Sequence, residues 1–183
     1  MKKRFLLLIC FITTSFNYGQ ASENYSAYLF TYFTGNSPAE EQIRFAVSGD
    51  GFEFVALNGG QPVINSADIA DKKAVRDPHI LRGEDGKTFY MVVTDMKSSE
   101  GWSSNRGIVL LKSTDLIHWT SAKVNIPTAF PAFSTIDRAW APQTIYDPVA
   151  KKYMVYFSMH VPNGKDIIYY AYANSSFTAL ETI

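Results

Sequence analysis

The chain has 183 residues, with 17 basic and 17 acidic side chains and a formal net charge of zero. No stretch is strongly basic, so nucleic acid is excluded as a partner class. The one cysteine, Cys10, lies in an N-terminal apolar run. The rest of the chain therefore cannot form a disulfide, a cysteine nucleophile or a thiolate metal site.

The first twenty residues have the layout of a secretory signal peptide. Three cations at positions 2–4 precede a wholly apolar run at 5–12, and mostly polar or small residues follow. The apolar run is much too short to cross a bilayer. We therefore expect a signal peptide at 1–20 and one domain at 21–183, secreted or periplasmic and free of the membrane after cleavage. Without the three cations, 14 basic residues stand against 17 acidic ones.

The expected domain reads as a succession of short strands. Each apolar, β-branched or aromatic run is bounded by Gly, Asp, Asn, Ser or Pro, and helical periodicity is almost absent. Strands spaced this closely, without helices between them, indicate an all-β sandwich, barrel or propeller. The clearest expected strands are Tyr28–Phe33, Gln42–Val47, Phe89–Thr94, Gly107–Leu111, Tyr153–Ser158 and Ile167–Ala173.

Internal repetition favours the propeller. Each period holds about four strand-sized segments, which is the content of one blade. The chain then has room for about two and a half blades, whereas closed propellers need at least four, so we expect the N-terminal part of a longer protein. A small stand-alone β-protein is the alternative. The repeated features are the strands led by Tyr28, Tyr90 and Tyr153, 62 and 63 residues apart, Pro78 and Pro142, 64 apart, and the segments 45–54 and 110–119, 65 apart.

The repeated Ser-x-Asp segments are expected to be structural. Ser and Asp close tight turns through hydrogen bonds from the backbone to their side chains. We therefore read Asp50 and Asp115 as blade corners and assign them no chemistry.

Catalytic candidates are sought where blades begin, because the innermost strand of each blade lines the central channel. Two such strands start at Arg76 and Arg138. The ordered set of motifs from there resembles glycoside hydrolase family 43, a family of five-bladed propellers. The matching pieces are Asp77-Pro78-His79-Ile80, Gly83–Gly86, Phe89–Val93, Ser113–Trp119 and Trp140-Ala141-Pro142.

The resemblance implies hydrolysis with inversion, with an Asp as general base, a second Asp that tunes the acid, and a Glu as the acid. Asp77 matches the base, and Arg76 beside it is expected to keep the carboxylate ionised. Family 32 propellers also use Arg-Asp-Pro, and in that register Asp77 would stabilise the transition state. The remaining alternative is an ordinary turn carboxylate, since Asp-Pro is common in turns.

The second carboxylate departs from the family pattern, because Gln143 follows Trp-Ala-Pro. An amide cannot supply the negative charge that raises an acid's pKa. Either Asp137 takes over, or activity is altered, or the propeller binds glycan without cleaving it. Gln143 is then a substrate contact or an ordinary strand amide. The resemblance places the catalytic Glu on a blade beyond Ile183.

Other candidates for the channel mouth are Trp140, whose flat ring could stack on a sugar or lie in the core, and His79. The exposed-loop residue Trp102 is a weaker candidate, and His118 and His160 are expected at the surface. The histidines show no zinc-site spacing, so we expect no metal ligands and no cofactor, with channel calcium left open.

The leading hypothesis is an exported hydrolase of polysaccharides or oligosaccharides that contain arabinose or xylose, with the sugar inferred from the resemblance alone. The alternatives are a non-catalytic glycan-binding propeller, a family 32-like fructan hydrolase, and an interaction propeller without a sugar ligand.

Overall fold

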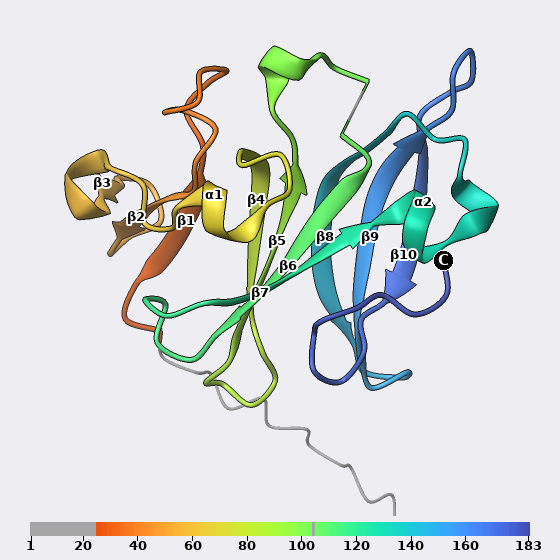
Figure 1. The fold of residues 1–183 in the computed structure, drawn as a ribbon. Helices are drawn as coiled ribbons and strands as arrows, with labels where there is room; N and C mark the ends of the chain where they lie inside the picture. The colour runs from red at the N-terminus through yellow and green to blue at the C-terminus, as the bar shows by residue number, and fades with distance from the viewer. Residues whose placement is uncertain (1–24, 104) are drawn as a thin grey trace, which may run out of the picture.

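The computed structural model describes residues 25–103 and 105–183, so the expected signal peptide lies outside the described residues. Within these ranges ten strands form three antiparallel sheets, which lie side by side in Figure 1. The first contains β1 (Tyr28–Tyr32), β2 (Arg44–Ser48) and β3 (Val55–Ala56). The second contains β4 (Val75–Arg82), β5 (Phe89–Asp95), β6 (Gly107–Ser113) and β7 (Thr120–Asn125). The third contains β8 (Arg138–Asp147), β9 (Lys152–His160) and β10 (Ile167–Tyr172).

The described helices are short. Those with α geometry are α1 (Ser66–Ile69) and α2 (Ile126–Ala129), and the 3-10 turns are Leu57–Gly60, Ser98–Glu100 and Pro131–Phe133. Asn65 and Asn125 cap the two α-helices by accepting backbone N–H groups. Within the described ranges, no helix has the length and apolarity that a membrane crossing requires.

The second sheet is buried on both faces. Successive side chains along its strands point to opposite faces, and each face packs against a neighbouring sheet. Met91 and Val93 of β5 pack with Phe45 on the side of the first sheet. Val92, between them, packs with Val155 and Phe157 on the side of the third sheet. The second sheet is therefore held between the other two.

The repeat predicted from the sequence is confirmed in the backbone. The strands led by Tyr28, Tyr90 and Tyr153 are β1, β5 and β9. β5 lies between β4 and β6, and β9 lies between β8 and β10. Both Ser-x-Asp turns have the expected geometry: Ser48 and Ser113 donate to Asp50 and Asp115, at 2.8 and 3.0 Å. In the first sheet the described neighbour of β1 is β2.

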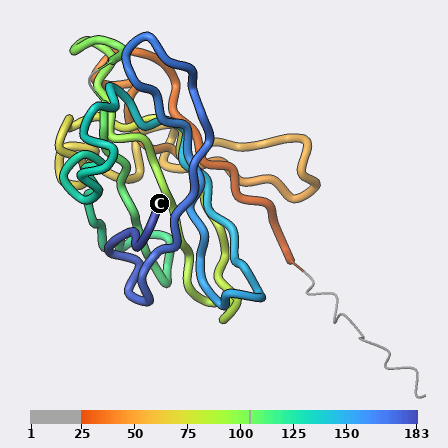
Figure 2. The backbone as a smooth tube through the Cα atoms, turned by 90° about the vertical axis from the view of Figure 1, so that its right-hand side faces the viewer, coloured from red at the N-terminus to blue at the C-terminus, as the bar shows by residue number. Residues whose placement is uncertain are grey.

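The strands β4 and β8 begin the second and third sheets and lie next to each other. They are the inner strands of two blades, as the sequence predicts. Figure 2 shows the segment from β2 to the turn at Leu57–Gly60 extending away from this side-by-side arrangement. The face of the third sheet that points away from the second is apolar and exposed at Ile145, Ile168 and Tyr170.

Candidate active site

Both inner strands carry the same irregularity. The register of β4 with β5 shifts between Arg76 and His79, and that of β8 with β9 shifts between Trp140 and Gln143. The residue before proline has a positive φ in each: 51° at Asp77 and 49° at Ala141. This conformation is uncommon for a residue other than glycine and marks a bulge that turns the residue out of the ladder.

The bulge in β4 places the half-buried Asp77 beside Thr94 of β5. The Thr94 hydroxyl lies 2.9 Å from Asp77 Oδ2 and donates to it. The same hydroxyl accepts the backbone N–H of Ala141, also at 2.9 Å. Thr94 is completely buried. One hydroxyl group therefore joins the bulges of two neighbouring blades.

Arg76 differs from its expected role. Its guanidinium forms an ion pair with Glu41 at 3.0 Å, and it does not pair with Asp77. It also donates to Asn36 Oδ1 at 2.7 Å and lies 4.4 Å from the ring centroid of Phe33. Arg76, which we expected to act on the neighbouring Asp77 carboxylate, thus has Glu41 as its ion partner. Arg76 instead holds the loop between β1 and β2 against the start of β4.

His79 lies in the contact between the two inner strands. Its Nδ1 accepts the backbone N–H of Thr144 at 3.3 Å, so the proton of the neutral ring is on Nε2. Burial lowers the pKa of His79 below its usual value of 6.5. The Nδ1 atom is thus occupied by the backbone of β8, and Nε2 is the donor of the neutral ring.

Gln143 is exposed on β8, two residues after the bulge. The hydroxyl of Tyr156 on β9 donates to its Oε1 at 2.5 Å. This contact fixes the amide with the oxygen toward β9 and leaves the NH₂ group as a donor. The position therefore offers a hydrogen-bond donor, and as an amide it carries no charge.

Trp140 forms a corner with Trp102 at the start of β8. Their ring centroids are 6.3 Å apart at an interplanar angle of 82°. Trp140 Nε1 donates to Oδ1 of the buried Asn105 at 2.5 Å, and Arg138 lies 4.4 Å from the Trp140 ring centroid. Trp102 remains 52% exposed, as its polar loop suggested. The two rings thus offer an immobilised aromatic edge beside the start of β8.

Asp137, the candidate to take over as the second carboxylate, pairs with a histidine. Its Oδ1 lies 2.7 Å from His160 Nδ1, and its N–H donates to the His160 carbonyl at 2.9 Å. The expected surface position of His160 is therefore wrong, because its side chain is only 14% exposed. His118 is at the surface as expected, 86% exposed beside Asp115. Next to Asp137, Arg138 binds Asp166 through two nitrogens, and this contact lowers the pKa of Asp166.

Three residues of this region were missed by the sequence analysis: Glu41, Thr94 and Asn105. Thr94 ends a run of β-branched residues and reads as an ordinary strand position. Glu41 lies in a loop with another glutamate, and its burial follows only from contact with Arg76. No sequence motif around any of the three residues marked it as part of this region.

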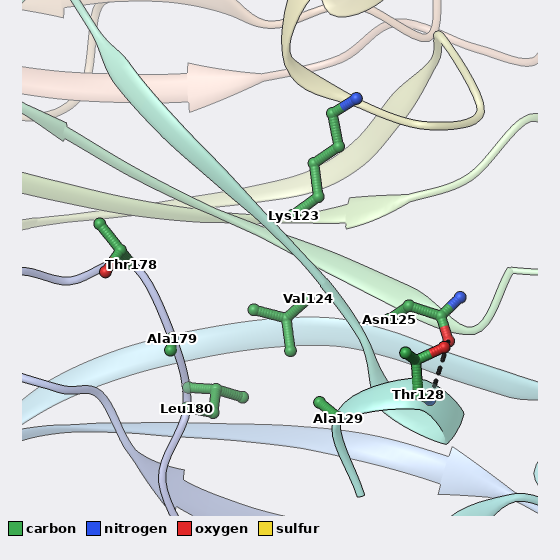
Figure 3. Close-up of a pocket in the computed structure, with 8 residues that line it drawn as sticks. All are labelled: Lys123, Val124, Asn125, Thr128, Ala129, Thr178, Ala179 and Leu180. Atoms are coloured by element: carbon green, nitrogen blue, oxygen red, sulfur yellow. Dashed lines mark hydrogen bonds between the residues drawn. The ribbon is translucent and has the colours of Figure 1, made fainter.

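Asp77 does not line the pocket drawn in Figure 3 and does not belong to a metal site among the described residues. Figure 3 shows a pocket of about 240 Å³ between β7 and the segment after β10, lined at its centre by Val124 and Leu180. None of its lining residues belongs to β4 or β8. In the part of the chain that the structure describes, no group of three or more His, Asp or Glu side chains is placed to hold a metal ion.

The family model described as "probable glycosyl hydrolase domain", related to glycosyl hydrolase family 43, matches residues 23–182. An α-L-arabinofuranosidase of Bifidobacterium longum subsp. longum is 33% identical over 149 residues, which are 73% of this chain and 13% of that protein. The chain therefore spans a small part of that relative's length.

Solved structures show the same fold. An exo-1,5-α-L-arabinanase from a bovine ruminal metagenomic library superposes with a TM-score of 0.59 at 13% identity, covering 88% of this chain and 50% of the other. An exo-β-1,3-galactanase from Phanerochaete chrysosporium, solved with β-1,3-galactotriose, gives 0.57 at 12% identity, covering 85% and 34%. The three described sheets are thus part of a propeller of the family 43 type. With the match over residues 23–182, the chain belongs to the glycosyl hydrolase domains related to family 43.

Proposed function

We propose that this chain supplies the base-bearing blades of an exported glycoside hydrolase that releases arabinose units from polysaccharides or oligosaccharides, with Asp77 as the carboxylate that activates water. The observation that carries the proposal is the bulge at Asp77, which takes the carboxylate out of the strand ladder of an inner strand and fixes it through Thr94. A residue buried only for packing would have no reason to carry a carboxylate there.

The chemistry requires two carboxyl groups on opposite faces of the sugar. In an inverting enzyme one protonates the leaving oxygen and the other takes a proton from water, about 6.5–9.5 Å away. Asp77 would accept the proton of the attacking water as the new C–O bond forms. The acid would give its proton to the departing glycosidic oxygen. Carboxylates on different blades supply this separation, and we assign the acid to another blade.

The sugar preference rests on the relative from Bifidobacterium longum, whose name states α-L-arabinofuranosidase. The aromatic edge of Trp102 and Trp140 would cover the apolar face of a sugar ring, and Gln143 would donate to a hydroxyl group. The export of the protein rests on the cations at 2–4 and the apolar run at 5–12.

The proposal is tested with the full-length protein and aryl glycosides of α-L-arabinofuranose, β-D-xylose and β-D-galactose, with levan added as a fructan. We expect turnover of the arabinofuranoside above the others, and proton NMR should show the inverted anomer as the first product. Turnover of the galactoside alone would show that the substrate contains galactose and not arabinose. Turnover of levan alone would favour a fructan hydrolase of the family 32 type. If none of these substrates is hydrolysed, the proposal that the protein is a glycoside hydrolase is contradicted.

The second candidate is a glycan-binding propeller without activity, and Gln143 favours it. Replacing Gln143 by Glu restores the charge in the place that the family pattern expects, while Tyr156 can still donate to the side-chain oxygen. A rise in kcat in Gln143→Glu would show that the amide limits an active enzyme. Sugar binding in both forms, with hydrolysis in neither, would establish the binding module.

A further inference from the structure

We propose that Thr94 is a positioning residue for the reaction: its hydroxyl group, oriented by the Ala141 amide of the next blade, fixes the Asp77 carboxylate for attack on water. The inference rests on the proposed function of Asp77. It extends that function to a residue that never touches the substrate and to a contact between two blades.

The proton positions of this contact follow from valence. The Ala141 N–H can only donate, so the Thr94 oxygen is its acceptor at 2.9 Å. The single hydroxyl proton of Thr94 is then free for Asp77 Oδ2, which also lies at 2.9 Å. The hydroxyl group therefore cannot rotate away without breaking one of the two bonds. Burial of Thr94 keeps water from replacing either of them.

Both bulges are needed for the contact. The register shift in β8 turns the Ala141 N–H out of the ladder with β9, and the shift in β4 turns Asp77 out of the ladder with β5. Thr94 pairs with Arg76 in the ladder of β4 and β5, directly beside the register shift of β4. The repeated positive φ thus has a use in each strand: at Asp77 it presents the carboxylate, and at Ala141 it presents the amide that orients the hydroxyl group.

The consequence for the reaction is directional. A hydrogen bond to one carboxylate oxygen fixes the plane of the group. With Oδ2 held by Thr94, Oδ1 is the oxygen that we assign to the attacking water. A misplaced reacting group costs rate more than it costs substrate affinity. The effect of losing the hydroxyl group should therefore appear in kcat.

The test compares Thr94→Val, which keeps the shape and removes the hydroxyl group, with Thr94→Ser, which keeps it. In the full-length protein, Thr94→Val should lower kcat about ten- to a hundredfold, the usual effect of losing one hydrogen bond to a charged group, with KM nearly unchanged. Thr94→Ser should keep kcat within about threefold of the wild type. A crystal structure of Thr94→Val should show the Asp77 carboxylate rotated from its wild-type orientation.

Two controls separate the possible failures. In an Asp77→Asn background, Thr94→Val should have no further effect on the remaining rate, because Thr94 acts through Asp77. Wild-type kcat in folded Thr94→Val, with Asp77→Asn inactive, would overturn the role of Thr94 and leave the proposed function intact. Full activity of Asp77→Asn would overturn the proposed function itself. If Thr94→Val does not fold, Thr94→Cys provides a weak donor, and wild-type kcat in that variant would also overturn the role.

Discussion

Glu41 and Arg76 form a nearly buried ion pair at 3.0 Å, with side chains 1% and 12% exposed. Glu41 Oε1 also accepts the backbone N–H of Ser98 at 2.9 Å, so the pair joins the β1–β2 loop, the start of β4 and the β5–β6 loop. The residue after Arg76 is Asp77. The scaffold of the candidate site therefore depends on an ion pair between a residue next to Asp77 and a loop residue far from it in the sequence.

Removing the charge of Glu41 should destabilise the protein strongly. Glu41→Gln leaves Arg76 without its ion partner, and breaking a buried pair from one side costs about 3–5 kcal/mol. The free energy of unfolding from urea titration measures this. The matched control is Glu181→Gln, which breaks the Lys152–Glu181 pair, where both side chains are more than 40% exposed. That change should cost less than about 1 kcal/mol. Equal effects of the two variants would contradict the bracing role of Glu41.

The protein should lose stability as the pH is lowered, and protonation of His79 should cause part of this loss. The unfolded chain takes up a proton near pH 6.5, whereas burial lowers the pKa of His79 in the folded protein. The unfolded state thus binds more protons as the pH falls below about 6.5, so stability is lost in that direction. Replacement by Asn, which retains an acceptor, should flatten this part of the profile. The melting temperatures of wild type and His79→Asn at pH 7.5 and 5.5 measure it, with His118→Asn as the exposed control. A wild-type slope identical to that of His79→Asn would show that His79 contributes nothing.

The first Ser-x-Asp turn contains a carboxylate, Asp50, whose pKa is lowered in the folded protein. The backbone N–H groups of Phe52 and Glu53 donate to Asp50 and lower its pKa from 3.8 to about 2. Its contribution to stability is present above pH 3.8 and is lost as the pH falls toward 2. The stability difference between wild type and Asp50→Asn should therefore shrink over that range. Hydrolysis by Asp50→Asn at neutral pH should be normal, and a loss of activity would contradict a purely structural corner.

The aromatic edge should affect substrate affinity more than folding. Trp102 is 52% exposed and contacts Trp140, so Trp102→Ala removes a stacking surface at small cost to the core. We expect KM for oligosaccharides to rise about three- to tenfold, in line with aromatic contacts worth about 0.5–1.5 kcal/mol. Phe52→Ala, at a side chain that is 89% exposed on the β2–β3 turn, is the control. An unchanged KM in Trp102→Ala would place the substrate elsewhere.

The strands were predictable because their signal is local. Apolar, β-branched and aromatic runs bounded by turn residues identified β1, β5 and β9, and the common period placed them in equivalent positions. The outer strand β7 was not among the predicted strands, since its sequence, Thr120–Asn125, is mostly polar. Edge strands exposed on one side give such a weak pattern.

The contacts of the candidate site were not predictable in the same way. Asp77 was recognisable from its motif, but its partner Thr94 and the amide of Ala141 meet only when two blades pack together. The assignment of Arg76 was wrong for the same reason, because adjacency in sequence suggested Asp77, whereas the fold brings Glu41 to the guanidinium. Long-range polar contacts depend on the assembled sheets, which no local pattern encodes.

The most direct test of the account is the rate of arabinofuranoside hydrolysis by full-length Asp77→Asn, with sugar binding measured on the same sample by calorimetry. Asp115→Asn is the matched control, because Asp115 accepts the backbone N–H groups of a turn and has no assigned role in the reaction. We expect Asp77→Asn to lose activity about 10²- to 10⁴-fold while it still binds sugar, and Asp115→Asn to remain active. Turnover by Asp77→Asn at the wild-type rate would contradict the account.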